Sequence, residues 1–150
     1  MIELNARIDT FKTNDGTYFS RCRLVFWGVA VGDYDELMLA GALNGAFIDL
    51  FKRIEGVELK FLTANQLQSC MVEIEQDVRN SYLPIGVESF DGDFAVCVNI
   101  DGIEKLVVRP WSGRLMVLEV SRSKYIKFMR GARKTLLEQC GRLGLNLGGV

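Results

Sequence analysis

The side chains in this sequence that could perform chemistry are mainly carboxylates, because the chain contains no histidine. Without imidazole, the Ser-His-Asp and Cys-His catalytic triads and the histidine-containing zinc sites are excluded. Two groups of acids could hold a divalent cation or divide the roles of general acid and general base. The first group is Asp33, Asp35 and Glu36, and the second is Asp91 and Asp93.

Both groups of acids also have a structural interpretation. The segment 33–36 stands before an apolar helical pattern, and carboxylates are favoured at the amino end of a helix. Asp91-Gly92-Asp93 has the composition of a turn. Because these interpretations suffice, we expect no catalytic residues, no cofactor and no metal, and the chain is predicted not to be an enzyme.

The cysteines and glycines indicate no reactive motif. The segment from Gly28 to Gly32 has neither the lysine nor the spacing of a phosphate-binding loop. The four cysteines form no C-x-x-C pair and are typical of small buried hydrophobic residues. They are Cys22, Cys70, Cys97 and Cys140.

The charged residues are distributed unevenly, although the formal net charge is −1. Residues 1–104 carry 8 basic and 17 acidic side chains, whereas residues 105–150 carry 10 basic and 2 acidic ones. Such a division can indicate an anionic partner, a cationic partner, or two parts of one fold that neutralise each other.

The stretch from residue 73 to residue 93 contains six acids and a single base, Arg79. Two of these acids, Glu73 and Asp77, would lie four residues apart near the carboxyl end of a predicted helix, where like charge and the helix dipole both disfavour them. We therefore predict that the six acids bind a cationic partner protein; the alternative is that they neutralise the basic last helix of the same chain. The six are Glu73, Glu75, Asp77, Glu88, Asp91 and Asp93.

The basic carboxyl-terminal segment indicates an alternative function. Lys127, Arg130 and Lys134 fall on one face of a predicted helix, which could contact several phosphates of a nucleic acid. A sequence pI near 5.5 and the acidic first two-thirds of the chain oppose a general nucleic-acid role. A nucleic-acid-associated or regulatory binding module is therefore the alternative to a protein-binding function.

The composition is that of one globular domain spanning residues 1–150. The chain is 49% hydrophobic and 25% charged, and its length allows a single core without disulfide or metal support. The least charged stretches, 37–48 and 61–72, are shorter than the roughly 20 apolar residues that a membrane-spanning helix needs. Charged residues stand where a signal peptide would have its apolar stretch, so we expect a cytoplasmic protein.

Strands are expected at the start of the chain. Alternation of apolar and polar residues predicts strands at 2–8 and 18–27. The turn-forming residues 13–17 should join them as an antiparallel hairpin, and a short third strand is predicted at 29–31.

Two helices are predicted next. Leu43, Phe47 and Leu50 recur at helical spacing and predict a helix over 35–54 that packs on an antiparallel sheet. A capping-box spacing predicts a second helix over 64–78, although alternation within 70–76 leaves a strand as the competing interpretation.

The second half should contain strands at 94–100, 103–109 and 115–120, then a helix beginning at Ser121 or Ser123 and a loose tail over 141–150. The order strands, helix, helix, strands, helix predicts an α+β single domain with a mostly antiparallel sheet and about three helices. The apolar stripe of the last helix is Ile126, Met129, Leu136 and Cys140.

Two segments resemble a known protein family. Phe26-Trp27-Gly28-Val29-Ala30-Val31-Gly32-Asp33-Tyr34, followed by an apolar helix, resembles a segment of bacterial immunity proteins of polymorphic toxin systems, in particular the immunity protein 42 family. Phe90-Asp91-Gly92-Asp93-Phe94, which leads into strands and a closing helix, extends the resemblance over most of the chain. The sequence departs from it at Arg109-Pro110-Trp111, where an unbroken strand is expected.

The resemblance implies a cytosolic protein that binds and neutralises a toxin domain, as in contact-dependent inhibition, and that needs no catalysis. Many such toxins are nucleases with cationic surfaces. An acidic surface on the inhibitor would steer the association and cover the toxin's site.

Overall fold

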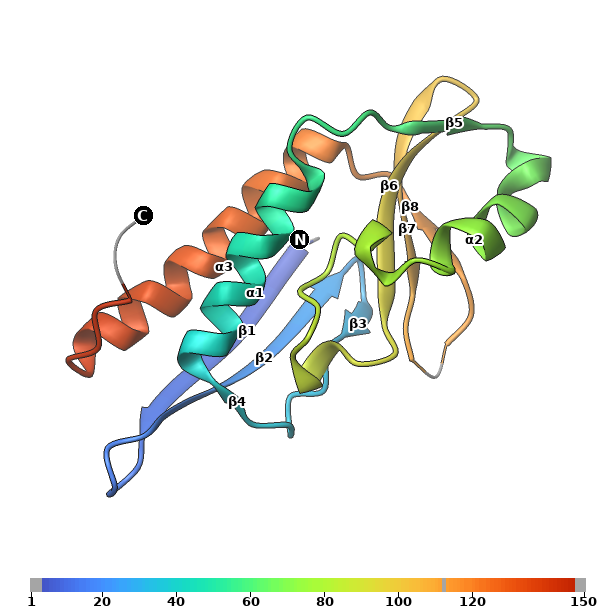
Figure 1. The fold of residues 1–150 in the computed structure, drawn as a ribbon. Coiled ribbons are helices and arrows are strands. Elements are labelled where there is room, and N and C mark those ends of the chain that lie inside the picture. The colour runs from blue at the N-terminus through green and yellow to red at the C-terminus, as the bar shows by residue number, and fades with distance from the viewer. Residues whose placement is uncertain (1–3, 112, 148–150) are drawn as a thin grey trace.

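A computed structural model describes residues 4–111 and 113–147 of this chain. Within these residues the fold contains three α-helices and two four-stranded sheets (Figure 1). The predicted α+β class with mostly antiparallel strands is therefore confirmed, but the strands form two sheets instead of one. The elements are β1 Leu4–Lys12, β2 Tyr18–Phe26, β3 Val29–Val31, β4 Met38–Leu39, α1 Ala40–Ile54, β5 Lys60–Leu62, α2 Leu67–Glu75, β6 Phe94–Ile100, β7 Ile103–Arg109, β8 Met116–Leu118 and α3 Arg122–Arg142.

The first sheet has the order β1-β2-β3, with the short β4 also paired to β2. All of its pairings are antiparallel, and the predicted hairpin between β1 and β2 is confirmed. Ile8 and Cys22 face each other in the register and are both buried. Helices α1 and α3 lie side by side over this face of the sheet (Figure 1).

The second sheet has the order β5-β6-β7-β8. Strands β6 and β7 form the predicted hairpin, and its turn places Asp101 at φ +52° and Gly102 at φ +89°. Strand β5, which the sequence pattern did not predict, pairs parallel to β6. β7 ends at Arg109, because the following Pro110 has no N–H to donate to a neighbouring strand.

The helix predicted over 35–54 begins at Ala40. Residues 33–36 form a turn instead, in which the Asp35 N–H donates to the Asp33 carboxylate at 2.9 Å and the Glu36 N–H donates to the Asp33 carbonyl at 3.2 Å. The prediction that these acids begin a helix was therefore wrong. The packing prediction is confirmed, because Leu43, Phe47 and Leu50 are fully buried.

The segment predicted as a helix over 64–78 is a shorter helix with a 3-10 turn before it. Residues Ala64–Gln66 form that turn, which has the predicted capping box between Thr63 and Gln66, and α2 ends at Glu75. The competing strand interpretation was wrong. Asp77 lies beyond the helix, so the expected helical pair of Glu73 and Asp77 does not form.

The last helix begins where the sequence predicted, with the Ser121 side chain accepting a 3.2 Å hydrogen bond from the Lys124 N–H. Its fully buried stripe contains Tyr125 in place of the predicted Ile126, which is half-buried. The helix continues through Arg142 into the segment that we expected to be loose, and Leu145 and Leu147 pack against the core. Residues 148–150 of that segment lie outside the described residues.

The cysteines fit their predicted role as small core residues. Three of the four, Cys22, Cys97 and Cys140, are buried, and Cys70 is half-buried. Burial raises the pKa of the Cys22 thiol to about 12, so that it is not a nucleophile near neutral pH.

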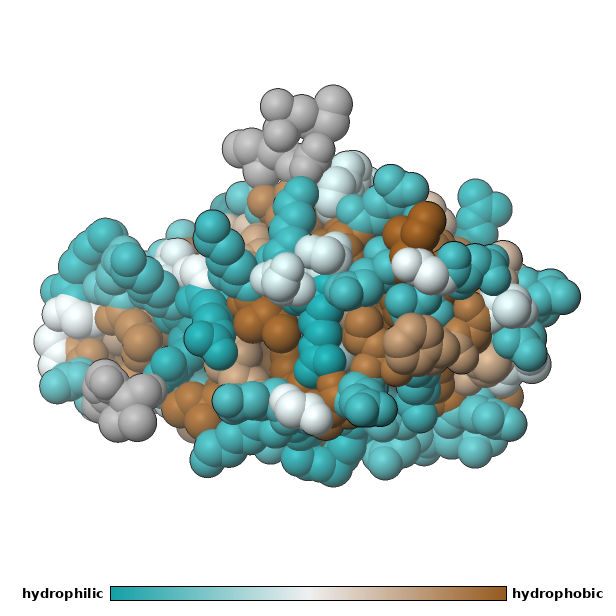
Figure 2. Space-filling model, turned by 90° about the horizontal axis from the view of Figure 1, so that it is seen from above, coloured by the Kyte–Doolittle hydropathy of each residue, from teal (hydrophilic) through white to brown (hydrophobic). Residues whose placement is uncertain are grey.

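The face of the molecule shown in Figure 2 has several separate hydrophobic patches, with hydrophilic residues between them. No helix within residues 4–111 and 113–147 is both long enough and apolar enough to cross a membrane.

Candidate functional site

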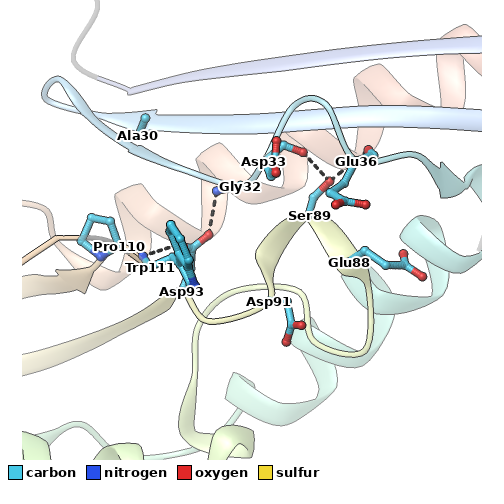
Figure 3. Close-up of a pocket in the computed structure, with 10 residues that line it drawn as sticks. All are labelled: Ala30, Gly32, Asp33, Glu36, Glu88, Ser89, Asp91, Asp93, Pro110 and Trp111. Atoms are coloured by element: carbon cyan, nitrogen blue, oxygen red, sulfur yellow. Dashed lines mark hydrogen bonds between the residues drawn. The ribbon is translucent and has the colours of Figure 1, made fainter.

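An acidic pocket of about 480 Å³ lies where the two sheets approach each other (Figure 3). Its lining comes from four segments: the end of β3 and the turn after it, a 3-10 turn at Glu88–Phe90, the segment before β6, and the residues after β7. We call this the acidic pocket. Its lining residues are Ala30, Gly32, Asp33, Glu36, Glu88, Ser89, Asp91, Asp93, Pro110 and Trp111.

Asp93 holds the pocket together by accepting backbone hydrogen bonds on both carboxylate oxygens. The Gly32 N–H donates to one oxygen at 2.8 Å, and the Trp111 N–H donates to the other at 2.7 Å (Figure 3). Burial raises the pKa of Asp93 above its ordinary value, and the two hydrogen bonds partly oppose that rise. Asp93 is therefore a structural residue of the pocket.

Ser89 joins two further walls of the pocket. Its buried hydroxyl donates to the Asp33 carbonyl at 2.9 Å, while the Asp33 N–H donates to the Ser89 carbonyl at 2.6 Å (Figure 3). This reciprocal pair fixes the turn at 33–36 against the 3-10 turn at 88–90. The carboxylates of both turns consequently lie around the same pocket.

Trp111 places an exposed aromatic ring at the acidic pocket, with 76% of the residue accessible to solvent. Its indole packs against Gly92, whose backbone has φ +86°, and a Cβ atom at this position would collide with the ring. Glycine is thus required at position 92 both by the left-handed backbone and by the close approach of the indole.

The lining of the acidic pocket is strongly asymmetric in charge. It includes five carboxylates, and none of its ten lining residues is a lysine or an arginine. Among the residues that the structure describes, no group of three acids or cysteines is close enough to hold a metal ion. The carboxylates are therefore spread around the pocket, an arrangement that suits several separate cationic groups better than a single ion.

The six acids predicted as one binding surface fall into two sets. Glu88, Asp91 and Asp93 line the acidic pocket together with Asp33 and Glu36. The other three, Glu73, Glu75 and Asp77, do not line it, and the predicted binding role of the six acids stays a prediction.

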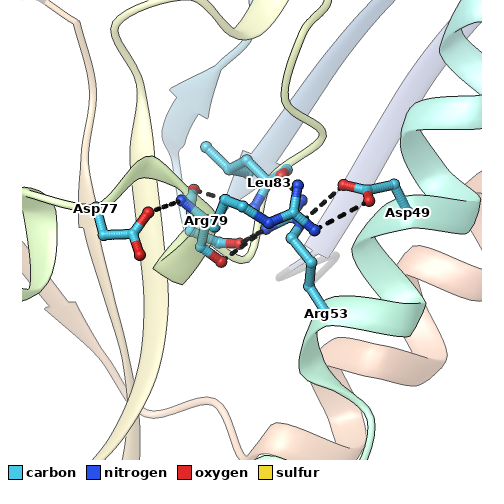
Figure 4. A network of polar contacts seen from close by, with 6 residues as sticks. Asp49, Arg53, Asp77, Arg79 and Leu83 are labelled. Atoms are coloured by element: carbon cyan, nitrogen blue, oxygen red, sulfur yellow. Dashed lines mark hydrogen bonds and ion pairs between the residues drawn. The ribbon is translucent and has the colours of Figure 1, made fainter.

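The three acids outside the pocket have other surroundings. Glu75 forms an ion pair with Arg109 of β7, and its side chain is only 11% exposed. The Asp77 carboxylate accepts a 3.0 Å hydrogen bond from the Arg79 N–H and so begins a 3-10 turn (Figure 4). Glu73 is exposed and lines a separate small cavity beside Lys60 and Phe61.

Arg53 in the last turn of α1 is a structural anchor. Its side chain is 4% exposed and forms a 2.8 Å ion pair with Asp49. The guanidinium also donates to the carbonyls of Arg79 and Ser81, and to that of Leu83 at 2.9 Å (Figure 4). These contacts hold the chain between α2 and the acidic pocket against α1.

Comparisons of this chain with protein families, with curated proteins and with solved structures found no match.

Proposed function

We propose that this chain is a non-catalytic binding protein that docks a cationic surface of a partner protein at the acidic pocket. The observation that carries this proposal is the presence of five carboxylates and an exposed indole around one pocket without a lining cation. Several carboxylates around one hollow attract a cationic partner over distance, and they accept its hydrogen bonds on contact. The Trp111 ring adds a face on which a lysine or arginine side chain can stack.

We further propose that the partner is a bacterial toxin domain, which the chain neutralises in the cytoplasm. Support comes from the two segments that resemble the immunity protein 42 family. Gly32 and Asp33 belong to the first segment, Asp91 and Asp93 belong to the second, and all four line the acidic pocket. A toxin that acts on nucleic acid carries the cationic surface that such a pocket fits.

The test compares two double variants of equal charge change. Glu88→Lys with Asp91→Lys reverses two exposed acids of the pocket, whereas Glu58→Lys with Glu138→Lys reverses two exposed acids away from it. The partner tested is the product of the neighbouring reading frame, which the proposal expects to be a toxin domain. Association is followed by surface plasmon resonance at low and high salt. We expect the pocket variant to associate at least about tenfold more slowly at low salt and to lose most of its salt dependence.

Both variants should keep the melting temperature of the unaltered chain, because the four substituted residues are exposed. Equal association rates for the two variants would reject the acidic pocket as the docking site. Failure of the unaltered chain to bind the neighbouring gene product would reject the toxin partner.

A further inference from the structure

A second groove, with the opposite charge, lies between the two long helices α1 and α3, which run side by side (Figure 1). It has a volume of about 390 Å³. α3 contributes residues at positions i, i+3, i+4 and i+7, the spacing of a single helical face, and α1 together with its C-cap residue Glu55 contributes a set with the same spacing. We call it the basic groove; its lining residues are Ile48, Phe51, Lys52, Glu55, Arg130, Arg133, Lys134 and Leu137.

The wall of the basic groove combines apolar side chains with cations. Ile48, Phe51 and Leu137 supply half-buried apolar surface. Four lysines and arginines surround it, and Glu55 is the single acid in the lining. The groove therefore offers a place for an apolar group with an anionic group beside it.

Two of the arginines in the groove are held in place by neighbouring side chains. The Arg133 Nε donates a 2.9 Å hydrogen bond to the side-chain oxygen of Asn44, a buried residue of α1. The guanidinium carbon of Arg130 lies 5.6 Å from the centre of the Phe51 ring. Both contacts cross from one helix to the other, so the cations are oriented by the packing of α1 against α3.

Three of the four cations in the lining stand without an ion pair among the described residues. Lys52, Arg130 and Lys134 form no ion pair with any residue of the described ranges. Arg130 and Lys134 also stand four residues apart on α3, where like charges disfavour the helix. An anionic ligand in the groove would relieve this repulsion.

We propose that the basic groove binds a compact anionic amphiphile, a free small molecule with one phosphate, sulfate or carboxylate head and an aromatic or apolar body. The volume falls within the range of about 300–1,000 Å³ that is typical of small-molecule pockets. The lining covers about two turns of each helix, roughly 11 Å. A nucleic-acid backbone is contacted by cations spread along a face, whereas these cations border a single hollow that also has apolar lining.

The first experiment uses 2-naphthyl phosphate and its neutral parent 2-naphthol as probes of the unaltered protein. Binding is measured by calorimetry, and the contacted residues are located by amide NMR shifts. We expect the phosphate to bind at least tenfold more tightly than the naphthol, with the largest shifts at 48–55 and 130–137. Absence of binding at millimolar phosphate, or shifts confined to other residues, would overturn the proposal.

The second experiment compares two double variants that each remove two positive charges from α3. Arg130→Gln with Lys134→Gln lies in the groove, whereas Lys127→Gln with Arg142→Gln lies outside its lining. We expect the groove variant to weaken 2-naphthyl phosphate binding at least tenfold and the control to change it less than twofold. Equal losses in both variants would show a non-specific charge effect and overturn the proposal.

Two further probes separate the free amphiphile from larger anions. A 20-base-pair DNA duplex and vesicles containing phosphatidylglycerol are each titrated with the same variants. Groove-dependent binding of either one, without binding of 2-naphthyl phosphate, would assign the groove to a nucleic acid or a membrane surface and would reject the proposal. The acidic pocket takes no part in these measurements, so they are independent of the toxin partner.

Discussion

The carboxylate of Asp93 accepts a 2.8 Å hydrogen bond from the backbone N–H of Gly32. Gly32 directly follows β3 of the first sheet, whereas Asp93 directly precedes β6 of the second sheet. The other oxygen of the same carboxylate accepts from Trp111, two residues beyond β7. One side chain therefore ties together the two sheets at the acidic pocket.

Replacement of this side chain should destabilise the fold. Asp93→Ala leaves the N–H groups of Gly32 and Trp111 without their acceptor, and we expect the free energy of unfolding to fall by about 1–3 kcal/mol. Urea denaturation measures the change. Asp91→Ala, two residues earlier and exposed, should stay within about 0.5 kcal/mol of the unaltered chain. Equal effects of the two substitutions would contradict this structural role.

Asp93 should also make stability depend on pH. Burial raises the pKa of Asp93 in the folded state above the ordinary value of 3.8, so the folded state holds this proton more tightly than the unfolded state. The contribution of Asp93 to the free energy of unfolding should therefore fall as the pH rises from 3.8 through the folded-state pKa.

The pKa can be measured by carbon NMR titration of the Asp93 carboxyl group. Denaturation at several pH values, with Asp93→Asn as the reference that lacks the titrating group, isolates its share of the slope. A midpoint at or below 3.8 would show that the two hydrogen bonds outweigh burial.

Gly92→Ala should disturb the exposed indole of the acidic pocket. The substitution adds a Cβ atom that collides with Trp111 and puts an alanine at φ +86°. Gly86→Ala provides a matched control, since Gly86 has φ +78° but open space around its Cβ direction. We expect a loss of about 1 kcal/mol for the control from backbone strain alone and a larger loss for Gly92→Ala. Only Gly92→Ala should change the tryptophan fluorescence.

Glu75→Lys should lower stability without affecting partner binding. The substitution places a second cation beside Arg109 at a side chain that is only 11% exposed. We expect a loss of about 1–2 kcal/mol in unfolding free energy, less than for a fully buried pair because Arg109 is partly exposed. Glu73→Lys on the same helix is exposed and should change stability by less than about 0.5 kcal/mol. A slower association of the Glu75→Lys variant with the toxin domain would contradict this prediction and would show that Glu75 belongs to the binding surface.

The fold class was predictable because its strongest signals are local. The buried positions Leu43, Phe47 and Leu50 repeat at helical spacing, and the Asp101-Gly102 turn joins two alternating segments. The division into two sheets depends on pairings that no local pattern specifies. Strand β5 has only three residues and is defined by its parallel partner β6.

The site was predictable only in part. The density of acids identified Glu88, Asp91 and Asp93, but the acids at 33 and 36 were attributed to a helix start. Their place in the acidic pocket depends on Ser89, whose hydrogen bonds to the backbone of Asp33 connect turns that are distant in sequence. The sequence contained one signal that could have indicated Trp111 as a site residue: it is a large aromatic residue directly after the proline that ends a strand.

Arg53 connects the loop after α2 to the helical layer. The carbonyls of Arg79, Ser81 and Leu83 all accept from this one guanidinium, which is itself rooted in α1. Residues 79–83 are therefore fastened to α1, although they contribute no strand to either sheet. Opening of this loop has to break its hydrogen bonds to Arg53, so α1 restrains the segment that leads to the acidic pocket.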